Sequence, residues 1–242
     1  MSEIAGNLAI LTAAKYLSNE HGKGILLGSI TGQPPSKVLI LGAGGVAEAA
    51  ARAAMGLGAQ VQVFDNNIYR LQSIQHNLGQ KIYTSVLDIF NLKKNIARAH
   101  VVIGALNEVN GRTPCVVTDE MVSGMKKGSV IIDVSIANGG CFETSRVTNH
   151  NEPIYLRHGV THYCVPNMAS NVSRTASYAL GNILAPLLHN IGDAGGIDNY
   201  LHKSFGFRHG SYMYKGSFTK EFIAQKFDLK FTDLDLLMSA TF

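Results

Sequence analysis

The fold of this 242-residue chain is decided by the stretch VLILGAGGVA at residues 38–47. Its four leading apolar residues predict a buried strand, the glycines predict a tight turn, and a helix is expected to open at Ala47. In such a unit the first glycine permits the turn, the second lets the backbone approach a pyrophosphate, and Ala47 allows close helix–strand packing. Because a helix N-terminus attracts phosphate, the unit predicts dinucleotide binding. The expected contacts are Gly42, Ala43, Gly44, Gly45 and Val46.

An acidic residue completes this pattern. Asp65 directly follows the apolar run at residues 61–64, which predicts the second strand. A carboxylate there can accept hydrogen bonds from both ribose hydroxyls, which favours NAD over a 2′-phosphorylated cofactor. Two other interpretations stay open: a purely structural glycine turn, and a capping role for Asp65 on the helix at residues 66–78. Arg70 lies in the first turns of that helix, where it either stacks near the adenine or is solvated.

The composition is that of an ordinary globular protein. Hydrophobic residues make up 46% and charged residues 16% of the chain, which is long enough for one large domain or one domain with an appendage. The net charge is only +4, and the lysines and arginines are scattered along the sequence. We therefore expect no nucleic-acid partner.

Cysteine usage and apolar runs bear on the cellular compartment. Cys115, Cys141 and Cys164 are widely spaced and form no CxxC or zinc-type pattern, so we expect reduced thiols. The N-terminus carries Glu3 and no basic segment, which does not fit a signal peptide. No apolar run reaches the length of a membrane span. These features predict a cytoplasmic protein without a membrane span.

Strands and helices alternate through most of the chain. Continuous apolar strands between helices predict a parallel sheet covered on both faces. The predicted fold class is therefore α/β, a Rossmann-type doubly wound parallel sheet with a C-terminal helical appendage. Further strands are expected at residues 81–86, 101–105, 130–134 and 160–165, and helices at residues 4–17, 46–57, 68–78, 91–99 and 118–125.

The character of the sequence changes after Pro166. A helix rich in alanine and leucine is expected at residues 173–190, with a kink at Pro186. Shorter helical stretches follow at residues 196–203 and 220–227, and no strand order is evident. We therefore divide the chain into a dinucleotide-binding domain, residues 1–172, and a C-terminal helical segment, residues 173–242.

Several segments together carry a resemblance to a known family. Besides the glycine turn, they are MSEIAG at residues 1–6, MGLGA at 55–59, GGCFET at 139–144, HYCVPNM at 162–168 and RTASYAL at 174–180. In this order they resemble the alanine dehydrogenase and nicotinamide nucleotide transhydrogenase alpha-subunit family, and alanine dehydrogenase more closely. The resemblance extends to about Pro186 and, more loosely, through the tail. It implies a nucleotide-binding domain and a catalytic domain assembled from the family's N-terminal half and C-terminal helices.

The resemblance also implies cofactor contacts outside the glycine turn. The family serine at position 2 reaches the pyrophosphate or ribose, although this residue equally fits a helix N-cap. Backbone contacts to the nicotinamide ribose are expected where the strand at residues 101–105 ends. The loop after the last strand matches the family's loop on the nicotinamide side. These contacts are assigned to Ser2, Ala105, Leu106, Asn107, Asn167 and Met168.

Two departures from the family bear on catalysis. The sequence starts where the family's nucleotide-binding domain starts, so the catalytic lysine and histidine belong to a segment that it does not include. None of the nine histidines matches them by motif. The family aspartate near the nicotinamide corresponds to Ala137, and Asn138 beside it cannot take a proton. We therefore expect the chain to be inactive, or nearly so, by itself.

Three residues invite a catalytic interpretation. Asp133 lies at a strand end, where turn-forming or capping roles are commoner than catalysis. His162 alternates with the apolar positions of its strand and is expected to be structural. Cys141 follows a glycine pair, but no local His or Asp motif supports a nucleophile. We therefore assign neither a catalytic residue nor a metal site.

These observations lead to one functional hypothesis and two alternatives. The chain is predicted to be the NAD-binding part of an alanine dehydrogenase-like oxidoreductase, which converts L-alanine to pyruvate and ammonium. One alternative is a non-catalytic NAD-binding subunit whose missing half is a separate polypeptide. The other is a truncated product without a physiological role, whose exposed surface would cause association. The resemblance further implies a homo-oligomer.

Overall fold

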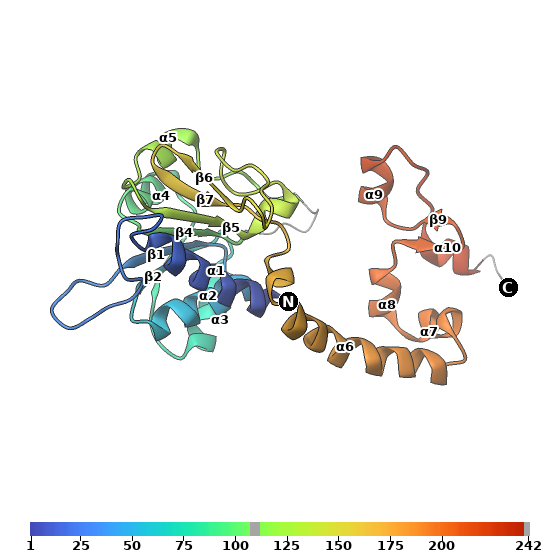
Figure 1. Ribbon diagram of the computed structural model, residues 1–242. Helices are drawn as coiled ribbons and strands as arrows, with labels where there is room; N and C mark the ends of the chain where they lie inside the picture. Colours follow the sequence, from blue (N-terminus) through green and yellow to red (C-terminus); the bar gives the residue numbers. More distant parts are fainter. Residues whose placement is uncertain (107–111, 240–242) are drawn as a thin grey trace. The chain divides into compact units, whose positions relative to one another are not determined.

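The computed structural model describes residues 1–106 and 112–239 (Figure 1). The chain forms two compact units, Met1–Ala176 and Ser177–Phe242. The division falls inside helix α6 (Ser173–Asp193). Asn107, one of the expected cofactor contacts, lies outside the described residues.

The first unit is built on a seven-stranded sheet with the order β3-β2-β1-β4-β5-β7-β6. All neighbouring strands are parallel except the pair β6 and β7. The chain order reverses between β1 and β4, which confirms the predicted doubly wound α/β fold. The strands are β1 (Lys37–Leu41), β2 (Gln60–Phe64), β3 (Tyr83–Ser85), β4 (Val101–Gly104), β5 (Val130–Asp133), β6 (Ile154–Arg157) and β7 (Val160–Tyr163).

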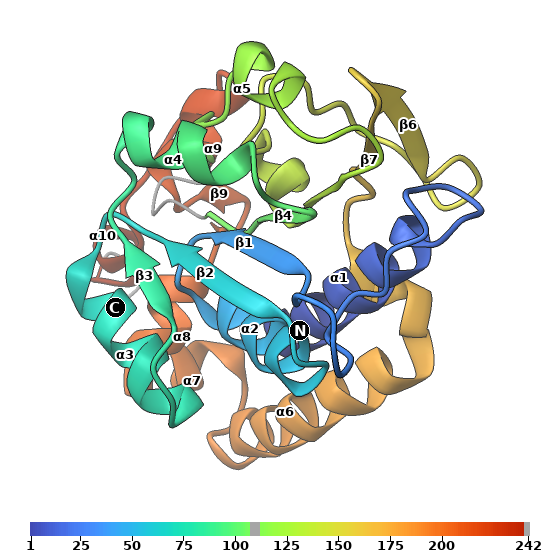
Figure 2. The same ribbon diagram turned by 90° about the vertical axis from the view of Figure 1, so that its left-hand side faces the viewer.

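Helices cover both faces of the sheet (Figure 2), and an apolar core lies on each face. Along β1, Val38 and Ile40 belong to one core, while Leu39 and Leu41 belong to the other. Because both faces are buried, these strands have continuous apolar sequences, as the sequence predicted. One face is covered by α1 (Ser2–Leu17), α2 (Gly45–Gly56) and α3 (Ile68–Leu78), and the other by α4 (Ile89–Ile96) and α5 (Asp119–Ser123).

Helices α1 and α4 begin at other residues than predicted, because other residues are their N-caps. Met1 is the N-cap of α1 and Ser2 already lies inside the helix, so the capping role considered for Ser2 is wrong. Helix α4 begins earlier than expected because the Asp88 carboxylate accepts a hydrogen bond from the Asn91 N–H at 3.0 Å. Asp88 is therefore a conventional N-cap that the sequence contained and the prediction overlooked.

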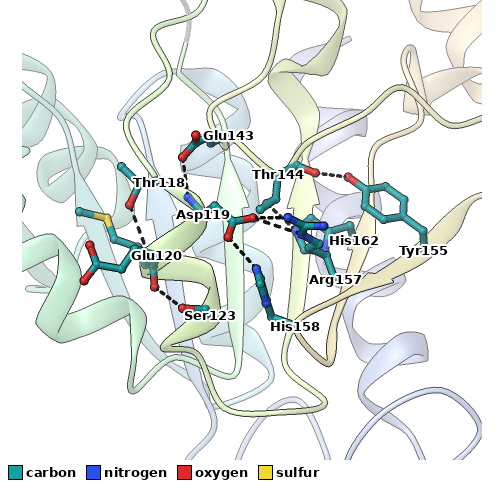
Figure 3. Close-up of polar contacts among 11 residues, drawn as sticks. Thr118, Asp119, Glu120, Ser123, Glu143, Thr144, Tyr155, Arg157, His158 and His162 are labelled. Carbon is teal, nitrogen blue, oxygen red and sulfur yellow. Dashed lines mark hydrogen bonds and ion pairs between the residues drawn. The ribbon is translucent and has the colours of Figure 1, made fainter.

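A β-hairpin closes one edge of the sheet and was not expected. Strand β6 pairs antiparallel with β7, and Arg157 lies opposite Val160 across a two-residue turn. The turn residues His158 and Gly159 have φ values of 53° and 74°, the left-handed backbone that tight hairpins favour. At the start of α5, the Asp119 carboxylate accepts hydrogen bonds from His158 at 2.7 Å and Arg157 at 2.9 Å (Figure 3). These bonds lower the pKa of Asp119 and hold the turn.

The second unit has a small core. Among its described residues, the buried apolar cluster consists of Leu201, Tyr214, Leu234 and Met238. Pro186 lies within α6. The other elements are α7 (Ile197–Lys203), α8 (Phe205–Gly210), α9 (Glu221–Lys226), α10 (Leu234–Ser239) and the hairpin of β8 (Met213–Tyr214) and β9 (Ser217–Phe218). Of these, α8, α10 and the β8–β9 hairpin were not expected from the sequence. Within the described ranges, no helix is both long and apolar enough to cross a membrane.

A buried imidazole ties the β6–β7 hairpin to a neighbouring loop (Figure 3). The His162 Nδ1–H donates to the Val160 carbonyl at 3.1 Å, so Nε2 accepts from the Thr144 hydroxyl at 2.8 Å. The Tyr155 ring stacks on this imidazole with the centroids 4.9 Å apart. Burial lowers the pKa of His162 to about 4. These contacts confirm the structural role expected for His162.

Replacing His162 with Gln is expected to remove an acid-sensitive contribution to stability. The imidazole takes up a proton below its usual pKa of 6.5 in the unfolded chain, but only near pH 4 in the folded chain. The wild-type protein therefore loses about 3 kcal/mol from this group as the pH falls through that window. Urea unfolding at about pH 7 and about pH 4.5 measures the loss, which should be smaller in His162→Gln. An equal loss in both proteins would contradict the prediction.

Candidate functional site

The glycine turn lies at the carboxyl edge of the sheet, where the strand order reverses. Gly42 has a φ of 109°, and its N–H donates to the Phe64 carbonyl at 2.6 Å. A Cβ at Gly42 would lie 2.7 Å from the carbonyl carbon of Ala105, which follows β4. Backbone conformation and this close approach therefore both require glycine.

Two helix N-termini lie side by side at this turn. Gly44 is the N-cap of α2, and nothing lies within 4 Å of the position that a Cβ would take there. A Cβ at Gly45 would lie 3.3 Å from the Ser2 Cβ in the first turn of α1. Further along, a Cβ at Gly6 would lie 2.7 Å from the Ala49 Cβ, so the two helices start together and stay in contact. Their free N–H groups and dipoles favour an anion beside the turn.

The Asp65 carboxylate fixes the turn to the end of β2. Its side chain is buried; Oδ2 accepts from the Ala43 N–H and Oδ1 from the Asn67 N–H, both at 2.7 Å. Each oxygen retains a further acceptor position. The N-cap of α3 is Asn67, whose side chain accepts from the Arg70 N–H at 3.1 Å. The capping role considered for Asp65 is therefore wrong, because Asn67 performs it.

Exposed apolar side chains gather where β2 and β3 end. These two ends are adjacent because the Asp65 N–H donates to the Ser85 carbonyl at 3.2 Å. Arg70 is exposed on the first turn of α3. These exposed apolar residues were not among the expected cofactor contacts. The sequence did offer a signal for such a surface, because aromatic and aliphatic residues follow each of the two strands. They are Ile68, Tyr69, Val86, Ile89 and Phe90, hereafter the apolar edge.

The loops after β4 and β7 border the other half of the same sheet edge. The Leu106 carbonyl accepts a hydrogen bond from the Ser135 hydroxyl at 2.6 Å, and Ala105 precedes it beside the glycine turn. Asn167 is exposed, with a φ of 52°. Met168 begins the 3-10 helix η2 (Met168–Val172), and the residue is only 3% exposed. Its side chain belongs to the core that α1 and α2 share with the sheet.

Asp133 organises the loop after β5. The side chain is 1% exposed, and its oxygens accept from the Ser135 N–H at 3.1 Å, the Cys141 N–H at 3.1 Å and the Ser145 hydroxyl at 2.6 Å. Burial raises the pKa of this carboxyl to about 6. Since these three partners belong to the loop that follows Asp133, and Asp133 is the N-cap of η1, it has the capping role, as expected.

The acid–base group exposed in this loop, Glu143, accepts a hydrogen bond from the Asp119 N–H at 2.7 Å. Ala137 is exposed in the 3-10 helix η1 (Val134–Asn138), and its methyl group can neither give nor accept a proton. Burial raises the pKa of the Cys141 thiol to about 12, which agrees with its rejection as a nucleophile. All three cysteines are free thiols. Among the residues that the structure describes, no group of His, Cys, Asp or Glu could hold a metal ion.

Replacing Asp133 with Asn is expected to remove a contribution to stability that decreases as the pH rises. Because the pKa rises from 3.8 to about 6, the folded chain keeps a proton that the unfolded chain has lost in this window. The wild-type protein therefore loses about 3 kcal/mol from this group between about pH 4 and about pH 6.

Urea unfolding across this pH range measures how the free energy of unfolding changes with pH. Asp133→Asn should be less stable near neutral pH, because an amide group replaces a carboxylate among three donors, and it should lack the decreasing contribution. His162→Gln, which changes the slope in the opposite direction, serves as the control. A pH profile of Asp133→Asn parallel to that of the wild type would show the prediction to be wrong.

Comparisons with known proteins agree with this geometry. The family model "Alanine dehydrogenase/PNT, C-terminal domain" matches residues 9–221. The chain is 37% identical over 240 residues to alanine dehydrogenase 2 of Staphylococcus aureus (strain USA300), covering 97% of this chain and 63% of the relative. It is therefore similar to less than two thirds of that protein's length.

Solved structures of alanine dehydrogenase and transhydrogenase are also similar to this chain. A structure of L-alanine dehydrogenase superimposes with a TM-score of 0.87 at 36% identity, covering 94% of this chain and 63% of that one. The transhydrogenase from Sinorhizobium meliloti shares the fold, with a TM-score of 0.67 at 24% identity over 78% of this chain and 54% of that one. The chain belongs to the alanine dehydrogenase/PNT C-terminal domain family, as its sequence motifs predicted.

Proposed function

We propose that this chain is the NAD-binding part of an alanine dehydrogenase-like oxidoreductase, which oxidises L-alanine reversibly to pyruvate and ammonium. The observation that carries the proposal is the turn after β1, where open backbone at Gly44 lies beside a buried carboxylate, Asp65. The similarity to alanine dehydrogenase 2 supports the reaction class. The free thiols support the proposal of a cytoplasmic protein.

The residues at the carboxyl edge suit the parts of a dinucleotide. The paired helix N-termini favour the pyrophosphate, and the free acceptor positions of Asp65 favour the ribose hydroxyls. The apolar edge and Arg70 offer a surface for the adenine. When bound, the nicotinamide supplies hydride transfer. The proposed contacts are Ser2, Gly42, Ala43, Gly44, Gly45, Val46, Asp65, Arg70, Ala105, Leu106, Asn167 and Met168.

Alanine oxidation needs groups that this sequence does not provide. We propose that a substrate-binding part from outside this sequence, in the same polypeptide or in a separate one, completes the site. The second unit supports such a partner, because Ile183, Leu188, Phe205 and Phe227 are each at least 63% exposed. We further propose a homo-oligomer, on the family resemblance alone.

The alternative is a non-catalytic NAD-binding subunit. It is favoured by one observation: the exposed Ala137 stands where the family has an aspartate near the nicotinamide, and its methyl group cannot exchange a proton. Such a subunit would bind the dinucleotide through the same turn but would not oxidise alanine.

The purified chain is expected to bind NADH with micromolar affinity and NADPH at least about tenfold more weakly, because a 2′-phosphate would meet the Asp65 carboxylate. Calorimetric titration measures both affinities. The difference should shrink in Asp65→Asn and persist in Asp228→Asn, a matched loss of charge in the second unit. Equal affinities in the wild type would contradict the role of Asp65, and binding of neither nucleotide would contradict the proposed function.

Restoring the carboxylate is expected to distinguish the enzyme from the non-catalytic subunit. The chain would be joined to the part of the Staphylococcus aureus relative that it does not match, and NADH formation from L-alanine would be measured. Ala137→Asp should raise turnover by about 10²-fold or more, since a positioned proton acceptor typically contributes that much. Ala137→Asn is the matched control and should not raise it. Turnover by the chain alone would overturn the need for a partner.

A further inference from the structure

A cluster of basic side chains lies at the amino ends of β1, β4 and β5, the sheet edge opposite to the glycine turn. Lys37 begins β1, His100 directly precedes β4, and Lys126 lies in the loop before β5. Lys23 reaches the same place from the loop after α1, because a Cβ at Gly128 would lie 3.3 Å from the Lys23 backbone nitrogen and closer still to its side chain. Four separate chain segments therefore bring these groups together.

The His100 imidazole faces two hydrogen-bond donors. Its Nδ1 accepts from the Lys37 backbone N–H at 2.9 Å. A neutral imidazole has a single acceptor nitrogen, so the proton of this ring is on Nε2. That Nε2 lies 3.4 Å from Nζ of Lys126, and an ammonium group can only donate. Two donors are thus close to one another without an acceptor, and an oxygen that lies within hydrogen-bond distance of both nitrogens would satisfy both.

No carboxylate balances these charges. In the described parts of the chain, Lys23, Lys37 and Lys126 form no ion pair. Glu20, just after α1, pairs with His21 at 3.4 Å instead. Burial first, and then the charges of Lys126, Lys23 and Lys37, lower the pKa of His100, which keeps the ring neutral. The positive charges therefore repel one another as they stand.

We propose that His100 and Lys126 bind an oxyanion, the phosphate group of a small molecule, at this edge of the sheet. An anionic oxygen accepts from the Nε2–H and from the ammonium group at once, and Lys23 and Lys37 add positive charge around it. A phosphate group fits best because it carries close to two negative charges and several acceptor oxygens. The site lies at the opposite strand ends from the glycine turn and is independent of the proposed function.

Inorganic phosphate is the probe for this site. NMR spectroscopy of the full chain follows the ring resonances of His100, which a His100→Gln variant identifies. Phosphate should shift these resonances with a dissociation constant in the millimolar range or below, and Lys126→Gln should weaken binding about tenfold. Lys94→Gln removes the same charge from the exposed surface of α4 and should leave the dissociation constant unchanged.

Acetate separates a phosphate ligand from a carboxylate ligand. Binding of acetate as tight as that of phosphate would overturn the proposal, as would ring resonances that phosphate does not move. Equal dissociation constants for Lys126→Gln and Lys94→Gln would overturn it as well. Because phosphate can also reach the glycine turn, only the His100 resonances report this site. Calorimetric titration should give the same NADH affinity for these variants as for the wild type. A failure of the phosphate proposal can therefore be told apart from a failure of the proposed function.

Discussion

The carboxyl edge of the sheet around the glycine turn depends on the hydrogen bond between the Ala43 N–H and the Asp65 carboxylate, 2.7 Å long. It fixes the turn after β1 to the end of β2, while Gly42 lets the same turn approach Ala105 after β4. Three strand ends are thus held together beside the exposed backbone of Gly44 and Gly45. The structural and the dinucleotide-binding interpretations of the turn are therefore compatible, because one carboxylate shapes the turn and still has acceptor positions for a ligand.

The sequence predicted the central sheet because strands buried on both faces have a local signature, a continuous apolar run between turn residues. Strand β6 lacks that signature, since an edge strand is stabilised by its pairing with β7 and by the turn at His158 and Gly159. The hairpin of β8 and β9 was missed for the same reason. The capping prediction for Asp65 failed because Asn67, two residues later, offers its side chain to the first turn of α3.

The glycine turn and Asp65 could be recognised from sequence because spacing along the chain fixes their relation. The apolar edge could not be predicted so directly, because Tyr69 and Phe90 come from segments that approach only through the pairing of β2 with β3. The burial of Met168 is equally non-local, since its side chain packs in the core that α1 and α2 share with the sheet. Local patterns thus indicate where the backbone turns, whereas the side-chain surface of the proposed site depends on which strands pair.

Neighbouring residues of one loop connect two buried titratable groups of opposite type. The Ser145 hydroxyl donates to Asp133, and the Thr144 hydroxyl donates to His162. Burial favours the neutral form of each, so their contributions to stability change in opposite directions over the same acidic range. The hydrogen bonds of both groups hold the loop, and both residues are buried from solvent. Asp133 and His162 thus fix the geometry of the loop that presents Ala137, whose methyl group can neither give nor accept a proton.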